Sequence, residues 1–182
     1  MAEKHKENFK FVWRVIAAHV IAYFVAGTFA MNLFDYENLF SSGILSCVMK
    51  PTTDPFIALG GTSLQVFRGI IVALILLPLR KVFTDEKYGF LKLGVLILGL
   101  SVLSTFGPAF GSIEGFIYTK MSVIEQIVGY PEALIWISLF VGILWSFYKF
   151  EKNAINIIAI ILLALIVLMG IFAYFLALTM NT

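Results

Sequence analysis

Residues 154–178 read AINIIAIILLALIVLMGIFAYFLAL, a run with no Asp, Glu, Lys, Arg or His. A helix needs about 20 consecutive, mostly apolar residues to cross a bilayer, and this run is longer than that. The whole chain of 182 residues follows the same trend, with 60% hydrophobic and 13% charged residues. Soluble domains have about 45–50% apolar and about 25% charged residues. The sequence therefore predicts an integral membrane protein.

Further apolar runs upstream predict an all-α fold, a polytopic transmembrane helix bundle of about five spans. We treat residues 1–182 as a single transmembrane domain. In the first span, small residues recur at every fourth position, which lets a second helix approach closely. These residues are Ala18, Ala22, Ala26 and Ala30. The predicted spans are residues 11–33, 64–79, 90–106, 131–148 and 154–178.

Two of the connections have patterns of their own. After span 1, apolar residues recur at every fourth position from Tyr36 to Val48, which predicts an amphipathic helix lying in the membrane interface. After span 3, Gly107-Pro108 breaks the helix, because proline lacks a backbone donor and clashes with the preceding turn. Residues 111–130 then form a broken segment, either a re-entrant hairpin or an interfacial helix.

The basic residues predict an orientation for these spans. With a cytoplasmic N-terminus, only Lys50 and Lys120 fall in outer loops. Arg14, near the start of span 1, is expected to snorkel to the inner interface. Such a bias toward inner loops is typical of multi-pass proteins of a cell membrane, here a prokaryotic plasma or inner membrane. Nine basic residues fall in cytoplasmic segments: Lys4, Lys6, Lys10, Arg80, Lys81, Lys87, Lys92, Lys149 and Lys152.

Composition excludes several classes of function. A single cysteine, Cys47, excludes an internal disulfide and a multi-cysteine metal site, and we expect no metal and no cofactor. The net charge of +2 does not indicate a nucleic-acid partner. The HExxH, GxSxG and Walker A motifs are absent, so the sequence specifies no reaction and no catalytic residue. The partners that remain are the lipid bilayer and either a second copy of the chain, forming a homo-oligomer, or a partner membrane subunit.

Charged residues near the outer ends of the spans form the candidate site. Arg68 lies within span 2, where an unpaired charge is costly, and Glu114 and Glu132 are its candidate partners. In one interpretation the three line an outward-facing pocket, where Arg68 binds an anionic group and a glutamate accepts or passes a proton. In the other, they form a structural ion pair that holds spans 2, 3 and 4 together.

His19, in span 1, is the second candidate site residue. The only other histidine, His5, lies in the N-terminal tail, so His19 does not form a metal or haem site with it. A hydrogen bond from His19 to a neighbouring helix is the simpler interpretation. Tyr23, one turn away, could join His19 in a polar track.

Three stretches resemble a group of small, uncharacterised prokaryotic polytopic integral membrane proteins. They are Phe67-Arg-Gly69 with Pro78-Leu-Arg80, then Gly107-PAFGSIEGFIY-Thr119, then Gly129-YPEA-Leu134. The resemblance covers roughly residues 11–148. It implies a multi-span membrane protein and no activity, because no function is known for that group. It includes Arg68, Glu114 and Glu132.

Three functions fit these observations. The first is transport or channel-like handling of a small solute or ion through the outward-facing polar pocket, for which a broken helix is typical. The second is a membrane-embedded enzyme acting on a lipid or lipid-linked substrate, with Arg68 on a phosphate and Glu114 or Glu132 as general base. The third is a structural or accessory membrane subunit, in which the charges serve only packing.

Overall fold

The computed structural model describes residues 2–42, 44–105 and 107–180, and these residues form an all-helical structure. Helix makes up 79% of it, and none of the described residues lies in a strand, which confirms the all-α class. The elements are α1 (Ala2–Leu33), α2 (Tyr36–Ser41), the 3-10 helix η1 (Leu45–Cys47), α3 (Pro55–Gly60), α4 (Gln65–Leu76), the 3-10 helix η2 (Leu77–Leu79), α5 (Arg80–Thr84), α6 (Gly89–Leu98), the π-helical η3 (Gly99–Leu103), α7 (Ile113–Tyr118), α8 (Val123–Ile127), α9 (Tyr130–Lys149) and α10 (Asn153–Met180).

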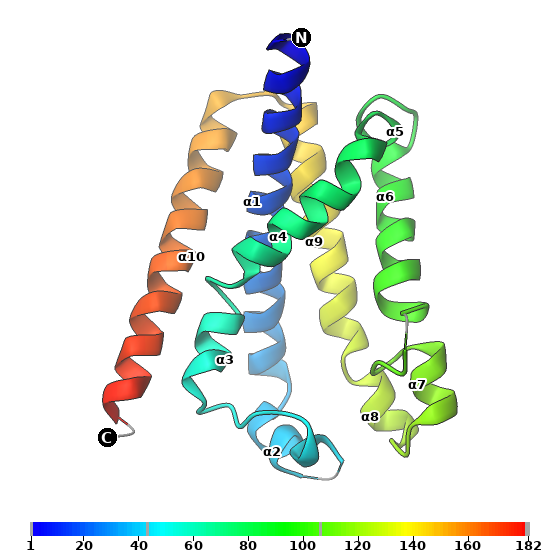
Figure 1. The fold of residues 1–182 in the computed structure, drawn as a ribbon, viewed down its shortest axis with the longest axis vertical. Helices are drawn as coiled ribbons and strands as arrows, with labels where there is room; N and C mark the ends of the chain where they lie inside the picture. The colour runs from blue at the N-terminus through cyan, green and yellow to red at the C-terminus, as the bar shows by residue number, and fades with distance from the viewer. Residues whose placement is uncertain (1, 43, 106, 181–182) are drawn as a thin grey trace.

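Four helical stretches within the described ranges are long and apolar enough to cross a membrane, as in a multi-pass membrane protein. Predicted span 3 corresponds to a shorter apolar stretch, Gly89–Leu103. The two chain termini lie at opposite ends of the bundle (Figure 1). We call these the N-terminal end and the far end. The four long stretches are Glu3–Leu33, Pro55–Thr84, Val123–Lys149 and Asn153–Thr179.

Helix α1 stands at the centre of the bundle and packs against α4, α9 and α10 (Figure 1). At Gly69 of α4 the two backbones are so close that a Cβ atom would lie 3.2 Å from Ile16 Cα. Glycine permits this close approach. The predicted small-residue stripe lies on buried positions of α1. Its four members are all buried: Ala18, Ala22, Ala26 and Ala30.

A break at residues 61–64 separates α3 from α4, and α10 covers it. A Cβ atom at Gly170 of α10 would overlap the side chain of Thr62. The hydroxyl of Ser63 donates a hydrogen bond of 2.8 Å to the carbonyl oxygen of Val167. Beyond the break, α4 crosses the bundle obliquely toward the N-terminal end (Figure 1). The segment before α4 is thus a helix interruption that is held by contacts with α10.

Three segments differ in extent from the sequence prediction. Residues 2–10, expected as a polar tail, belong to α1. The helix predicted from Tyr36 onward ends at Ser41, because the Ser42 backbone is extended at φ −122° and ψ 161°. After η3, the chain turns at Gly107 with φ +97°, a left-handed conformation that glycine adopts without strain, and only the short α7 and α8 precede α9. The interfacial and re-entrant placements of these segments stay predictions.

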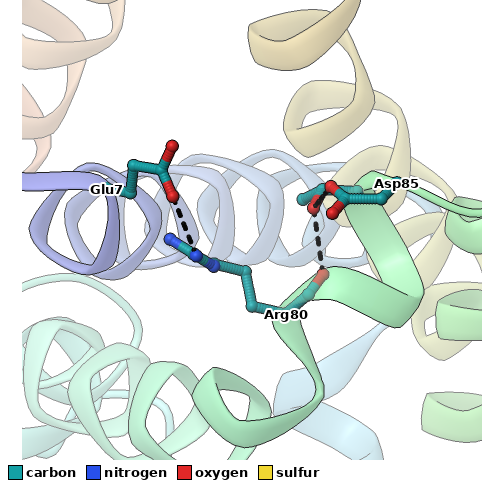
Figure 2. A network of polar contacts seen from close by, with 4 residues as sticks. Glu7, Arg80 and Asp85 are labelled. Atoms are coloured by element: carbon teal, nitrogen blue, oxygen red, sulfur yellow. Dashed lines mark hydrogen bonds and ion pairs between the residues drawn. The ribbon is translucent and has the colours of Figure 1, made fainter. Parts of the chain in front are cut away.

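Ion pairs join several elements at the N-terminal end. Arg80 Nη2 of α5 lies 3.0 Å from Glu7 Oε2 of α1, as Figure 2 shows. Lys10 Nζ of α1 lies 3.2 Å from Glu151 Oε1, in the connection between α9 and α10. Both pairs reach across from the first two turns of α1. They show that the helical N-terminal segment is packed against the rest of the bundle rather than extending away from it.

Candidate functional site

Arg68 lies in the first turn of α4, and its guanidinium group is held by two aromatic rings. Its Cζ atom is 5.5 Å from the ring centroid of Tyr23 on α1 and 5.5 Å from that of Trp136 on α9. Such contacts are attractive because an aromatic face is electron-rich. No carboxylate oxygen of the described residues lies within 4.0 Å of the group. The direct ion pair to Glu114 or Glu132 that the sequence indicated is therefore not formed.

Arg68 also lies deeper than its predicted position near the outer end of the bundle. Tyr23, its neighbour, precedes the end of α1 by ten residues, which is about 15 Å of helix. The reason is α3, which fills the space between the break and the far end, where the sequence predicted only a connection. Arg68 itself remains exposed to the surroundings of the bundle. A charge at this depth in a membrane protein is costly and is typically functional.

Glu132 lies in the first turn of α9 and is half-buried. The hydroxyl of Tyr36, from α2, donates a hydrogen bond of 2.5 Å to its Oε2 atom. A negative charge is favoured there by the dipole of α9. Burial, the hydrogen bond to Glu132 and the charge of Glu132 together raise the pKa of Tyr36 above its ordinary value. Tyr36 thus stays a protonated donor, and the Glu132 carboxylate is left with one oxygen free to accept from another group.

A cavity of about 500 Å³ opens beside this hydrogen bond, and we call it the main cavity. This volume lies in the range typical of small-molecule sites. Five polar side chains line it, namely those of Tyr23, Tyr36, Thr52, Gln65 and Glu132. Glu132 is the only charged residue among the described residues that line it. The apolar part of the lining includes Met31, Phe40, Met49, Phe56 and Ile57.

A second cavity of about 290 Å³ also borders the Tyr36–Glu132 hydrogen bond. It shares Tyr36, Phe40, Met49 and Glu132 with the main cavity, and its other walls come from η3, α8 and the start of α9. The hydrogen bond between α2 and α9 therefore lies in the wall that both cavities share.

His19 is fully buried and bonds to a neighbouring helix, as its simpler interpretation predicted. Its Nε2 atom lies 3.1 Å from Oε1 of Gln65 on α4. The Gln65 amide nitrogen donates to the carbonyl oxygen of Gly60 at 2.7 Å, so Gln65 Oε1 is the acceptor and His19 Nε2 carries the proton. Gln65 lines the main cavity and His19 does not. His19 is thus a positioning residue that joins α1 to the break before α4.

Glu114 lies apart from the other predicted site residues. It is exposed in the first turn of α7 and lines neither the main nor the second cavity. The glycine-rich stretch around it has a structural explanation in Gln126, whose side chain is buried. Gln126 accepts from the Gly111 amide at 2.8 Å and donates to the Gly115 carbonyl oxygen at 2.8 Å. A Cβ atom at Gly115 would clash with Ala109, so this turn requires glycine.

The structure also corrects the prediction for Arg14. Instead of snorkelling to an interface, its side chain is fully buried among α1, α9 and α10. Its Nη2 atom donates to Asn156 Oδ1 at 3.3 Å, and its Cζ atom lies 4.9 Å from the Tyr148 ring centroid and 5.4 Å from that of Phe147. The reason is that α1 extends to Ala2, which places Arg14 about three turns inside the helix rather than at its edge.

Sequence reasoning missed two residues that shape the site. Tyr36 was assigned to an apolar stripe, although a tyrosine in such a stripe also carries a hydroxyl that needs an acceptor when it is buried. Gln65 was not selected as a candidate, although a polar residue that begins an apolar span indicates a hydrogen-bonding role. The sequence therefore indicates that both side chains form hydrogen bonds, but it does not identify the residues to which they bond.

Comparison with known proteins does not assign this chain to a family. No family model, curated protein or solved structure matches the chain. Across the described ranges, no group of three or more His, Cys, Asp or Glu side chains is placed to hold a metal ion. The chemistry of the site therefore has to be derived from Arg68, Glu132 and the cavity between α1, α3 and α9.

Proposed function

We propose that the protein handles a small solute or ion in a transport or channel-like manner through a polar pocket open toward the far end. The observation that carries the proposal is the main cavity, which places the half-buried carboxylate of Glu132 beside the helix break. Interrupted helices often form ion and substrate sites in transporters, since their free backbone groups can bind a ligand. Arg68 supplies a positive charge one turn deeper in the bundle.

The proposal includes a topology of five spans, with α6 and η3 as the fifth crossing and the N-terminus in the cytoplasm. In support, α6 packs against α9, and the two chain termini lie at opposite ends (Figure 1). A bias of basic residues toward one end is the usual signal for orientation. Cysteine labelling from outside the cell tests it, in a Cys47→Ser background with a single cysteine at Lys87 or Lys120. We expect labelling at position 120 and protection at position 87.

Flux assays in liposomes test the function itself. The purified protein is reconstituted, and the release of K⁺, Na⁺, H⁺ and small amines or phosphates is compared with that of empty liposomes. We expect flux of at least one of these species, and its loss in Glu132→Gln, because this variant keeps the side-chain shape but removes the charge. Glu37→Gln is the matched control, since Glu37 is exposed on α2 and does not line the main cavity.

The absence of any flux across this panel would contradict the proposal and leave the structural or accessory subunit as the better interpretation. Flux that survives in Glu132→Gln would contradict the assignment of the site. Reconstitution must be verified for each variant by the amount of folded protein in the liposomes, so that a loss of flux is not a loss of protein.

A further inference from the structure

Arg68 and Glu132 carry opposite charges in the same part of the bundle, and neither has an oppositely charged partner. No Lys, Arg or His nitrogen of the described residues lies within 4.0 Å of the Glu132 carboxylate, and no carboxylate lies that near to Arg68. Tyr23 interacts electrostatically with both. Two unmatched charges at membrane depth are costly for the protein alone. A ligand that matches both would remove that cost.

The residues that contact the two charges are offset by about one helical turn along α1 and α9. Arg68 lies over the rings of Tyr23 and Trp136, whereas Glu132 Oε1 lies 3.9 Å from the position of a Cβ atom on Gly27. Tyr23 precedes Gly27 by four residues on α1, and Glu132 precedes Trp136 by four on α9. Four residues of helix correspond to about 6 Å. The offset is too long for an α-amino acid, whose ammonium nitrogen and carboxylate carbon are two bonds apart, and fits a ligand whose charged groups are about four bonds apart.

A second donor accompanies Arg68. The indole nitrogen Nε1 of Trp136 is buried and has no hydrogen-bond acceptor within the described part of the chain, and the residue is 8% exposed. A buried donor without an acceptor is costly and unusual in native proteins. Arg68 contacts this ring, so an anionic group bound by Arg68 would lie beside Trp136.

The main cavity provides room and suitable walls at the other end of the ligand. It is lined by Glu132 and by the aromatic side chains of Tyr23, Tyr36, Phe40 and Phe56. Aromatic faces around one carboxylate are a typical environment for an ammonium group. The free oxygen of Glu132 can accept a hydrogen bond from such a group while Tyr36 occupies the other oxygen.

We propose that Arg68 and Glu132 bind a single zwitterionic ligand of the phosphoethanolamine type, with its phosphate on Arg68 and its ammonium on Glu132. This inference rests on the proposed function and names the substrate class of the same pocket. The group exists both as a free solute and as the headgroup of a lipid. Phosphate suits Arg68, because the guanidinium fork bonds two oxygens at once.

Equilibrium binding to the detergent-solubilised full chain tests the proposal with three probes: phosphoethanolamine, ethanolamine and inorganic phosphate. We expect phosphoethanolamine to bind at least roughly tenfold more tightly than either of the other two, since only it satisfies both charges. Equal affinities for all three probes, or no binding of phosphoethanolamine, would overturn the inference. Flux of another species in the liposome assay would then leave the proposed function standing.

Two variants separate the ends of the ligand. Glu132→Gln should remove the advantage of phosphoethanolamine over phosphate, and Arg68→Gln should remove its advantage over ethanolamine. The controls are Glu37→Gln and Lys120→Gln, two exposed residues outside the main cavity. If either site variant binds phosphoethanolamine as the unaltered chain does, the assignment is wrong. Circular dichroism of each variant shows that a loss of binding is not a loss of fold.

Nanodiscs distinguish the two sources of the ligand. If the ligand is a lipid headgroup, nanodiscs of phosphatidylethanolamine should compete with the free probe at least tenfold better than those of phosphatidylglycerol, and Arg68→Gln should abolish the difference. If it is a free solute, the probe should bind equally in both. Either result supports the zwitterionic site, whereas stronger competition by phosphatidylglycerol would overturn it, because that headgroup has no ammonium.

Discussion

Arg14 and Arg68 are two arginines within apolar helices, and they differ in how far the bundle encloses them. Both guanidinium groups lie against two aromatic side chains of neighbouring helices, and neither forms an ion pair with a described carboxylate. Arg14, however, is fully buried between three helices, whereas Arg68 is exposed and lies beside Tyr23, which lines the main cavity.

The comparison shows that the aromatic contact alone does not distinguish a structural arginine from a functional one. An enclosed guanidinium group, as in Arg14, is unavailable to a ligand and can only hold helices together. An accessible one next to a polar cavity can still gain a partner. Burial and the neighbouring space, rather than residue type or depth in the sequence, separate the two roles.

The largest effect should come from removing the enclosed arginine. Arg14→Ala leaves a space between α9 and α10, and truncation of a large buried side chain costs about 2–5 kcal/mol of unfolding free energy. Arg14→Met fills much of that space without a charge and should be neutral or stabilising, by up to about 4 kcal/mol. Unfolding of both variants in detergent measures the difference. Equal destabilisation of both would show that the charge itself is required.

A smaller effect should follow from Tyr36→Phe, which removes the donor to Glu132 without emptying the site. Hydrogen bonds to charged groups contribute about 1.5–3 kcal/mol, and the half-exposed position points to the lower end of this range. The raised pKa of Tyr36 adds a pH test. The stability that the Tyr36 hydroxyl contributes is fully present below the ordinary tyrosine pKa near 10. This stability is lost as the pH rises above that value.

The stability difference between the unaltered chain and Tyr36→Phe should therefore shrink above about pH 10 and stay constant below it. Unfolding curves collected between pH 7 and pH 11 measure it. A difference that does not change with pH would mean that the hydroxyl is not bonded to Glu132 in solution.

Gly69→Val tests the exposed arginine without touching it. A side chain at this position would press against Ile16 and His19 of α1, and overpacking costs about 1–3 kcal/mol. It should also move α4 away from Tyr23 and weaken binding at Arg68, while the Arg14 contacts stay intact. Gly142→Val on α9 is the control, since a Cβ atom there meets nothing within 4 Å. Similar losses in both variants would point to a general effect of valine.

The smallest effect should come from a third arginine, Arg80, whose ion pair with Glu7 is partly exposed. The Arg80 side chain is 12% exposed and the Glu7 side chain 59% exposed, and pairs with an exposed partner contribute about 0–1 kcal/mol. Arg80→Gln should therefore change the unfolding free energy by less than about 1 kcal/mol, with less effect at high salt. A loss as large as that of Arg14→Ala would show that this end of the bundle is held by charge rather than by packing.

Much of the fold could be predicted from sequence, because membrane spans follow from the length of apolar runs. The all-α class and the alanine stripe of α1 were of this kind. The interruption at Ser42 could not be predicted, since a regular apolar spacing does not show where the backbone becomes extended. The helical conformation of residues 2–10 could not be predicted either, since a polar sequence does not show that another element packs against it.

The candidate site was predictable only in part. Arg68 and Glu132 were found because charges within or beside apolar spans are costly, and such charges can be recognised from the sequence alone. Their partners were not, because Tyr36 lies far from Glu132 along the chain, Trp136 lies far from Arg68, and neither partner carries a charge. Glu114 satisfied the same rule as Glu132, yet it is exposed, because the turn held by Gln126 directs the following helix away from the cavity.

The covering of the α3–α4 break by α10 has a consequence for biosynthesis. Ser63 receives its acceptor from Val167, about a hundred residues later, and Thr62 is covered by Gly170. During synthesis the break therefore enters the membrane long before its cover, and its polar groups must be met by water or by the insertion machinery until α10 arrives. Helix α10 is thus the last helix to be synthesised and the one that completes the packing around the break. Chains halted before Asn153 should be recognised as unfinished by the quality control of the cell.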